Sequence, residues 1–207
     1  MEHDDNESRA YNEWYDEKSR QMERMLGKEH NMVMHAIIPF DIGGSLDLYY
    51  YPYGIKGTAI ATKELVPLPG EGPSNDRFET YELVMFTRQK LVMDDAKKPR
   101  TAFGKVHQSI NLILNNVARY APQATLNPNE TLEFPRDMQD VGGKCIFFDE
   151  YGSDNPYKTA EFGLLALIEI FRSEMEFAMR EGGGVLLDKL KAAGHYPYSD
   201  MDRRPVA

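Results

Sequence analysis

The sharpest pattern of apolar and polar positions lies near the C-terminus. Residues 163–170 form a nearly continuous apolar run, which is typical of a buried strand. Ser173 and Glu176 then have the spacing of a capping box, so a helix is expected to begin there and to end at Gly182. A second short helix is expected over the apolar residues 185–190. The pattern therefore predicts one strand followed by two helices.

The N-terminal region predicts a single amphipathic helix. Residues 9–26 carry apolar and aromatic side chains at helical spacing, with one interruption at Lys18, and Gly27 is a natural stop. We expect the aromatic stripe of this helix to pack on the domain. Residues 1–8 are polar and acidic and are expected to be frayed.

Strands dominate the next part of the chain. Runs with strand-like patterns, separated by glycine- and proline-containing turns, cover residues 32–38, 46–51, 58–62 and 80–87. In the last of these runs both alternating sets of side chains are largely apolar. A strand of that kind is covered on both faces, so we expect it to be central in its sheet.

The remaining elements complete an α+β layout. Residues 101–120 predict a long helix, residues 127–136 are interrupted by prolines and predict little structure, and residues 144–148 predict a short strand. We expect a single domain with a mixed, mostly antiparallel β-sheet and helices packed on it. An acidic segment and amphipathic helix would occupy residues 1–30, and the domain itself would occupy residues 31–207.

The order of these elements resembles the Suppressor of fused domain family in its bacterial single-domain form. The resemblance runs from about Met32 to the C-terminus and includes a Glu-x-x-Phe-Ala motif after the buried strand and a terminal Asp-Arg-x-x-Val. Residues 58–65 and 81–86 also fit the family. The family usually has Gly followed by Leu or Met and then Ser where this chain has Lys63-Glu64-Leu65.

The resemblance implies a binding protein without enzymatic activity. Bacterial members are linked to toxin systems as immunity proteins, and the eukaryotic relative restrains a transcription factor by binding an extended peptide. By this resemblance the protein would neutralise a cognate toxin, such as a nuclease, in the cytoplasm. A neighbouring gene that encodes a secreted toxin would favour this role. A peptide-binding regulatory protein is the alternative within the same family.

Composition and charge narrow the classes of partner. The chain has 207 residues, of which 42% are hydrophobic, so it can bury a substantial core. Its 24 basic and 33 acidic residues give a net charge of −9, which disfavours nucleic acid and suits a basic protein partner. No apolar run is long enough to span a membrane. The acidic start and the single cysteine, Cys145, lead us to expect a cytoplasmic protein.

The sequence offers little catalytic or metal-binding chemistry. The five histidines have no metal-ligand spacing, and no phosphate-binding loop or nucleophile elbow is present, so we expect no metal and no cofactor. The competing hypothesis is an enzyme, a small hydrolase that uses Asp47 and Glu82, or Cys145. A structural role for these residues is the stronger interpretation, since carboxylates in strands are usually paired and buried cysteines behave as small apolar groups.

A tyrosine-rich hairpin is one predicted partner-binding surface. Tyr49, Tyr51 and Tyr53 would lie on one face beside Asp47. Tyrosine is frequent at interface hot spots because it combines a rigid ring with a hydrogen-bonding hydroxyl. An equally favoured interpretation is that the N-terminal helix covers these rings.

Two further predictions concern charged residues. Asp149, Glu150 and Asp154 form an acidic cluster that would steer a basic partner toward the domain. Glu169 lies inside the apolar run and needs a cation, for which Arg172 and Arg203 are the candidates. We expect Arg203 to fold back and form a structural ion pair that closes the domain, with Glu169, Asp200 or Asp202 as its partner.

Overall fold

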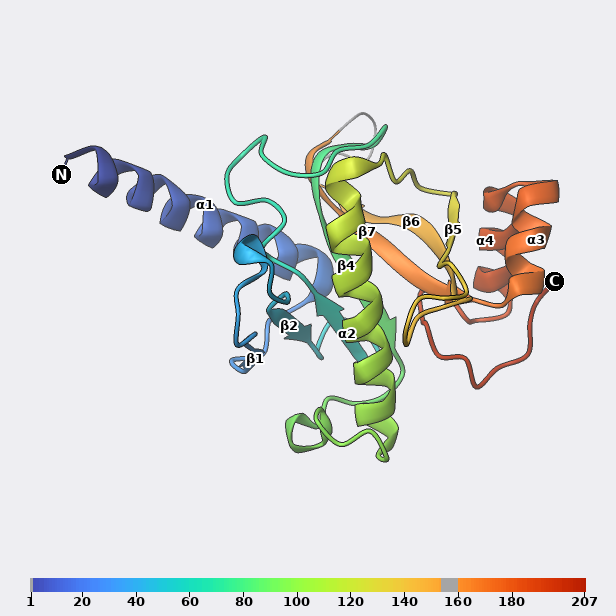
Figure 1. Cartoon of the computed structure of the whole chain (residues 1–207). Coiled ribbons are helices and arrows are strands. Elements are labelled where there is room, and N and C mark those ends of the chain that lie inside the picture. Colours follow the sequence, from blue (N-terminus) through green and yellow to red (C-terminus); the bar gives the residue numbers. More distant parts are fainter. Residues whose placement is uncertain (1, 154–159) are drawn as a thin grey trace.

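A mixed β-sheet forms the centre of the computed structural model, which describes residues 2–153 and 160–207, and side chains from residue 9 onward (Figure 1). The strands lie in the order β1-β2-β3-β4-β7-β6-β5. They are β1 (Val33–Met34), β2 (Leu48–Tyr51), β3 (Thr58–Ala61), β4 (Phe78–Thr87), β5 (Thr131–Glu133), β6 (Cys145–Ser153) and β7 (Ala160–Ile170). β4 and β7 are parallel, and the other neighbours are antiparallel. The predicted α+β class with a mixed, mostly antiparallel sheet is confirmed.

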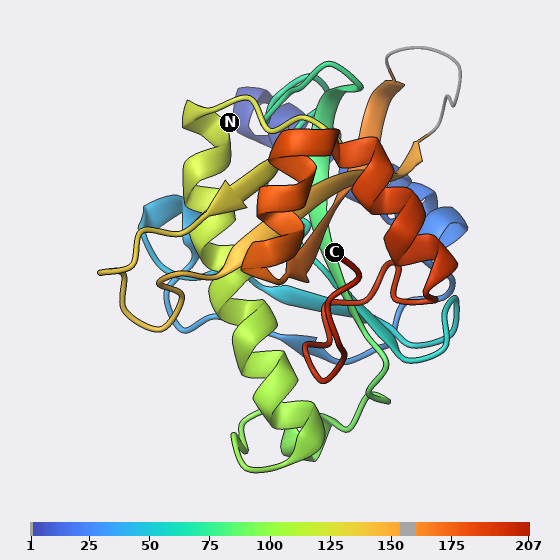
Figure 2. The ribbon, with the colours of Figure 1, turned by 90° about the vertical axis from the view of Figure 1, so that its right-hand side faces the viewer.

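Helices cover both faces of this sheet (Figure 2). On one face, α2 (Ala102–Tyr120) contributes to an apolar cluster with β2, β4 and β6. On the other face, α1 (Glu2–Leu26) packs over β2, β3, β4 and β7, while α3 (Arg172–Glu181) and α4 (Gly183–Ala192) pack over β6 and β7. Single 3-10 turns occur at Phe40–Ile42, Met93–Asp95 and Ala121–Gln123. The middle of the sheet is therefore buried, and its edges are β1 and β5.

The strand predicted to be central is central. β4 lies between β3 and β7. Leu83 points into the cluster beneath α2, whereas Val84 and Phe86 point into the cluster beneath α1, and all three are fully buried. This confirms that the two apolar faces of the 80–87 run reflect coverage on both sides.

Three boundaries differ from the sequence predictions. α1 begins at Glu2, so the helix extends through the segment expected to be frayed. β1 ends at Met34, because the Asp47 carboxylate accepts the Ala36 N–H (2.8 Å) and takes that group away from strand pairing. The proline-interrupted region contains β5, a strand that the sequence did not predict.

A buried lysine joins α1 to the sheet. Lys18, the residue that interrupts the apolar stripe, is 2% exposed. Its ammonium donates to the carbonyls of Lys63 (2.7 Å) and Val66 (2.6 Å) and to the Glu82 carboxylate (3.2 Å). Trp14 on the same helix also donates to the Val66 carbonyl (3.0 Å). The predicted packing of α1 on the domain is confirmed, and its polar interruption is part of that packing.

A second buried lysine strengthens the same junction. Lys63 is 3% exposed, and it forms an ion pair with Glu29, beyond the end of α1. Its ammonium also donates to the Ser19 hydroxyl (2.9 Å) and lies 4.7 Å from the centre of the Tyr49 ring. Lys63, which stands where the family usually has another residue, therefore holds the N-terminal helix in place.

The C-terminal segment is held by Glu174 and not by the residues predicted from spacing. The Glu174 carboxylate accepts the Phe171 N–H (2.9 Å), so Glu174 caps α3 in place of the predicted Ser173 and Glu176 pair. Arg203 folds back, as expected, and donates to both oxygens of Glu174 (2.6 and 2.8 Å).

The predicted pairing of Glu169 with Arg203 is wrong. Glu169 instead accepts from the Lys144 ammonium (2.6 Å) and from the Ser109 hydroxyl (3.3 Å). Lys144 immediately precedes β6, which runs beside β7 and so brings this cation next to Glu169. Glu169 and Glu174 are each paired with a cation, but the sequence predicted neither pair.

We expect replacement of Lys18 to destabilise the fold strongly. Lys18→Ala would remove the cation that is paired with the buried Glu82 carboxylate and the donor to the Lys63 carbonyl, and losing one partner of a buried pair costs roughly 3–5 kcal/mol. Urea unfolding at neutral pH measures the change. Lys28→Ala, which removes an exposed lysine just beyond the same helix, is the matched control and should change the free energy of unfolding by less than about 0.5 kcal/mol. Equal effects of the two variants would contradict the proposed role of Lys18.

The Arg203–Glu174 pair predicts a pH-dependent contribution to stability. Burial raises the pKa of Glu174, but hydrogen bonds from Arg203, Val206 and Phe171 outweigh it and hold the pKa below its ordinary value. The pair therefore stabilises the fold above the ordinary carboxyl range, and this stabilisation is lost as the pH falls through the lowered pKa. The free-energy difference between wild type and Arg203→Ala should be roughly 3–5 kcal/mol at neutral pH and should narrow in acid.

Chemical unfolding at neutral and acidic pH measures that difference. Arg204→Ala, an exposed neighbour, serves as the control. A deficit of Arg203→Ala that stays constant across the carboxyl range would show that the charge of Glu174 does not hold the tail.

Candidate functional site

β5 is a short edge strand enclosed between two prolines. Pro128 and Pro135 flank it, and proline is confined to edges and ends of strands because it lacks an N–H. Among the described residues β5 pairs with β6 alone, with Thr131 opposite Phe147. Its other side is therefore an open edge.

The open edge presents unpaired backbone groups. The Glu130 carbonyl accepts the Phe148 N–H of β6 (3.0 Å), and the Phe134 N–H donates to the carbonyl of Lys144, just before β6 (3.0 Å). Bonding alternates along an antiparallel pair, so the N–H and C=O groups of Thr131 and Glu133 point away from β6. In the described part of the chain, no hydrogen bond to these outward groups is present. They are available to another strand.

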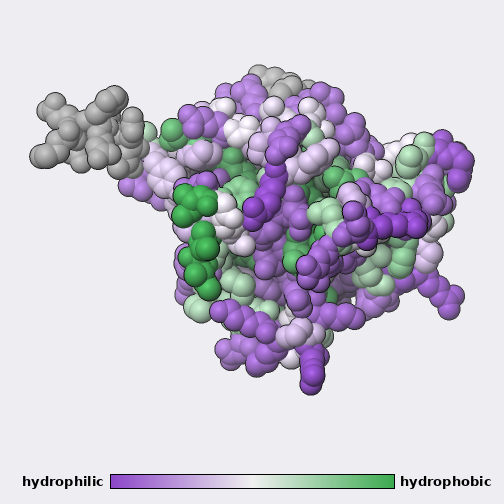
Figure 3. All heavy atoms as spheres, in the orientation of Figure 1, coloured by the Kyte–Doolittle hydropathy of each residue, from purple (hydrophilic) through white to green (hydrophobic). Residues whose placement is uncertain are grey.

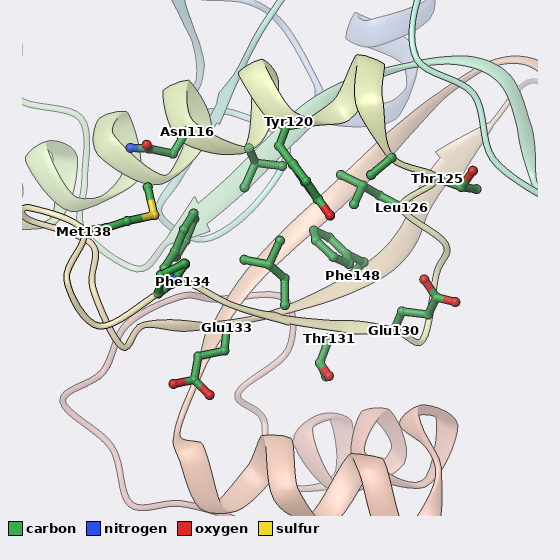
Figure 4. A pocket seen from close by; sticks show the side chains of 14 residues that line it. Asn116, Tyr120, Thr125, Leu126, Glu130, Thr131, Glu133, Phe134, Met138 and Phe148 are labelled. Atoms are coloured by element: carbon green, nitrogen blue, oxygen red, sulfur yellow. The ribbon is translucent and has the colours of Figure 1, made fainter.

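An apolar groove of about 570 Å³ runs along β5 on the α2 side of the sheet (Figure 4). It lies between the end of α2, the segment that follows this helix, and β5. Tyr120, which is 48% exposed, points across the groove toward β5. The apolar lining also includes Val117, Leu126, Leu132, Phe134, Met138 and Phe148. An apolar side chain entering the groove would be buried on several sides.

A second hollow lies on the opposite side of the same strand. The side chains of Thr131 and Glu133 point toward this side (Figure 4). Glu133 forms a bidentate ion pair with Arg172 of α3, and hydrogen bonding to Arg172 lowers the pKa of Glu133. The hollow measures about 290 Å³ and is bordered by Ala178 and the exposed Met179. Space for side chains is thus present on both faces of β5.

This arrangement suits an extended peptide. An added strand would bond to the outward groups of Thr131 and Glu133, and its side chains would alternate between the groove and the hollow. The backbone bonds would supply affinity, and the two depressions would supply selectivity. No proton transfer or nucleophile is required of these residues.

Two of the predicted acidic residues lie next to the start of β5. Asp149 and Glu150 line a polar hollow of about 580 Å³ together with Asp76, Asn127 and other residues. Burial raises the pKa of Asp149, which accepts a hydrogen bond from Tyr196, and Arg77 donates to both oxygens of Glu150 (2.7 and 2.9 Å). Asp154, the third member of the predicted cluster, lies outside the described residues.

The predicted tyrosine surface is largely covered. Tyr49 and Tyr51 are buried with Met22 and Leu26 of α1, so the helix shields the rings that we expected on a partner-binding surface. Tyr53, beyond the end of β2, is 67% exposed. Of the two equal alternatives, coverage by α1 therefore holds for Tyr49 and Tyr51, and the expectation of one exposed tyrosine face is corrected.

The candidate hydrolase residues have structural partners. Asp47 accepts the Ala36 N–H and lies 2.6 Å from the His35 ring nitrogen. The buried Glu82 accepts from Lys18, from the Thr62 hydroxyl (2.6 Å) and from backbone N–H groups. Cys145 is buried in the cluster beneath α3 and α4, and burial raises the pKa of its thiol. Each of the three has a role in packing that explains it.

The groove itself was missed from sequence. Residues 127–136 were expected to be irregular because prolines interrupt them. The signal that could have found β5 was the strand-length spacing between Pro128 and Pro135, which is typical of an edge strand. The groove also needs Tyr120 from α2, and no sequence pattern links that helix to β5.

Neither a membrane-spanning helix nor a cluster of metal ligands is present in the part of the chain that the structure describes. Over residues 2–153 and 160–207, no helix is long and apolar enough to cross a membrane. In the same residues, no three His, Cys, Asp or Glu side chains gather in a way that could hold a metal ion.

Comparison with solved structures shows the same fold in Suppressor of fused proteins. The chain superimposes on a protein in the Sufu–Fu complex with a TM-score of 0.60 at 14% identity, covering 95% of this chain and 92% of that one. For a Suppressor of fused homologue from Neisseria gonorrhoeae FA 1090 the TM-score is 0.54 at 12% identity, with coverage of 91% and 93%. For Drosophila Suppressor of Fused the TM-score is 0.53 at 18% identity. There the match covers 82% of this chain and 46% of the other.

Comparison by sequence identifies the family. None of the curated proteins compared with the chain matches it. The model of the Suppressor of fused protein family matches residues 57–204, which is more than half of the chain and includes β3 to α4 and most of the C-terminal segment. The match leaves α1, β1 and β2 outside it. The chain therefore belongs to the Suppressor of fused family.

Proposed function

We propose that this protein binds a protein partner by pairing an extended segment of the partner with β5. The observation that carries the proposal is the open edge of Thr131 and Glu133 between two hollows. Unpaired backbone groups on an edge strand readily accept another strand, and adjacent depressions give such an interaction selectivity. Family membership supports protein interaction as the general role.

The segment bound by β5 would carry at least one large apolar side chain. The groove beside Tyr120 is lined mainly by apolar side chains, so it would favour a leucine, a phenylalanine or a similar residue. Next to the start of β5, the polar hollow is lined by Asp76 and Asp149, by the paired Arg77 and Glu150, and by Lys191, so it would suit a polar segment of the same partner. The bound sequence would therefore combine apolar and polar residues.

The more specific role proposed is that of an immunity protein, which the acidic charge of the chain supports. The net charge of −9 would speed encounter with a basic protein. Nuclease toxins are basic because they bind phosphate backbones, so an acidic inhibitor in the cytoplasm would both attract and cover such a toxin. The same edge could instead serve a regulatory protein that binds peptides, and co-expression distinguishes the two roles.

Co-expression with the product of the neighbouring gene tests the immunity role. If that product is a toxin, wild-type protein should restore growth. Cell death in the presence of abundant, folded protein would contradict immunity.

Replacing one backbone donor tests the proposed mode of binding. Thr131→Pro removes an N–H that points away from β6, so the pairing of β5 with β6 should persist. Thr131→Val keeps the N–H and the size of the side chain and is the matched control. We expect the proline variant to bind the partner at least about tenfold more weakly and the valine variant to bind within about twofold of wild type, measured by titration calorimetry.

Circular dichroism and thermal unfolding establish that both variants are folded. If a folded Thr131→Pro variant binds like wild type, β5 does not pair with the partner. If both variants bind equally weakly, the Thr131 side chain and not its backbone makes the contact.

A further inference from the structure

A turn before β2 exposes several large apolar side chains at the opposite end of the sheet from the groove. Within residues 32–42, Ile37 is 101% exposed, Ile42 72%, Ile38 56% and Met32 53%. Single exposed apolar residues are common, but four within eleven consecutive residues form a local patch that marks an interaction site. Hydrophobic atoms gather on this side of the molecule in Figure 3. We call residues 37–42 the isoleucine turn.

The isoleucine turn is held in a defined shape. The Gly44 N–H donates to the Pro39 carbonyl (2.8 Å), and the Ser45 N–H donates to the Ile38 carbonyl (3.0 Å). A side chain at Gly44 would place its Cβ 1.7 Å from the Ile38 carbonyl oxygen, so only glycine fits there. These contacts fix the turn and display the isoleucines at little further entropic cost on binding.

Contacts with α2 also anchor the turn to the domain. Phe40 packs against the core, and the Arg119 guanidinium lies 5.8 Å from the centre of its ring. Arg119 also donates to the Gly44 carbonyl, and Asn115 accepts the Leu46 N–H (2.8 Å). Inward-facing residues thus hold the turn while the isoleucines remain outside.

Carboxylates border the isoleucine turn. Asp41 is exposed within it, Asp47 holds its base, and Glu64 accepts the Asp47 N–H (2.7 Å). Burial raises the pKa of Glu64, the hydrogen bond from the Asp47 N–H opposes this, and the charges of Asp47, Glu82 and Asp41 raise it further. Two basic side chains contact this region: His35 lies beside Asp47, and Arg119 donates to the Gly44 carbonyl. The three carboxylates Asp41, Asp47 and Glu64 therefore outnumber these two basic side chains at the border of the turn.

We propose that the isoleucine turn is a second docking surface, which binds an apolar surface bordered by lysine or arginine on a basic protein partner. The inference rests on the proposed function in assigning a basic partner, but it concerns a different contact. β1 and β5 are the two edges of the sheet, and the isoleucine turn contacts Arg119 of α2 whereas the groove is lined by Tyr120 of the same helix, so the two surfaces adjoin different faces of α2. A second copy of the chain is the less suitable occupant, because two acidic borders and two net charges of −9 repel each other.

A pair of synthetic amphipathic peptides tests the chemistry of this surface. One peptide combines leucine with lysine, and the other has the same leucines with glutamate. Both are titrated into labelled protein at physiological salt and followed by NMR. We expect the leucine–lysine peptide to shift signals of residues 32–47 and the leucine–glutamate peptide to bind at least about tenfold more weakly.

Matched variants distinguish apolar contact with the isoleucine turn from attraction by the net charge of the protein. Ile37→Ser combined with Ile42→Ser should weaken binding of the leucine–lysine peptide at least about tenfold, and Asp41→Asn combined with Glu64→Gln should weaken it several-fold. Val92→Ser combined with Val185→Ser removes two exposed apolar side chains elsewhere and should leave binding unchanged. Thr131→Pro should also leave it unchanged, so failure of the β5 proposal is distinguishable from failure of this one.

Three outcomes would overturn the inference. Peptide shifts that fall outside residues 32–47 would place the contact elsewhere. Equal binding by wild type and the isoleucine variant would show that net charge alone attracts the peptide. Sedimentation that shows a dimer of wild type, lost in the isoleucine variant, would make a second copy of the chain the occupant.

Discussion

The ion pair between Lys18 and Glu82 is the constraint on which the arrangement of α1 and the sheet depends. Lys18 binds two carbonyls and one carboxylate, and Glu82 also accepts from Thr62 and from two backbone N–H groups. Both side chains are almost fully buried. A charge in such surroundings is tolerated only when all its hydrogen-bonding groups are satisfied. The pair therefore requires α1, β4 and the segment after β3 to keep one relative position.

Because this ion pair fixes α1 over one face of the sheet, the proposed binding surfaces lie at the edges of the sheet. α1 covers the tyrosines of β2, α2 covers the opposite face, and α3 with α4 covers β6 and β7. The faces are thus occupied by the chain's own helices. β5 retains outward backbone groups at one edge, and the isoleucine turn lies beside β1 at the other. A rigid centre with two exposed edges suits a protein that binds others.

Sequence patterns predicted the elements with strong periodicity and missed contacts between distant segments. The two apolar faces of β4 placed it at the centre, and the apolar run of β7 indicated a buried strand, because burial acts directly on residue type. The partners of Glu169 and Arg203 were wrong, since ion pairs depend on which loops the fold brings together. Lys18 looked like an interruption of the helix stripe, because its partner is 64 residues away. The groove needs α2 and β5 together, and neither segment alone indicates it.

Amide hydrogen exchange of β5, measured residue by residue in the free protein and in complex with its partner, tests the central claim most directly. In the free protein the Thr131 and Glu133 amides should exchange quickly because they point away from β6, whereas the Leu132 and Phe134 amides should be protected. In the complex, Thr131 and Glu133 should become protected as a partner strand bonds to them. Protection that arises elsewhere, while these two amides continue to exchange quickly, would contradict binding by strand addition at β5.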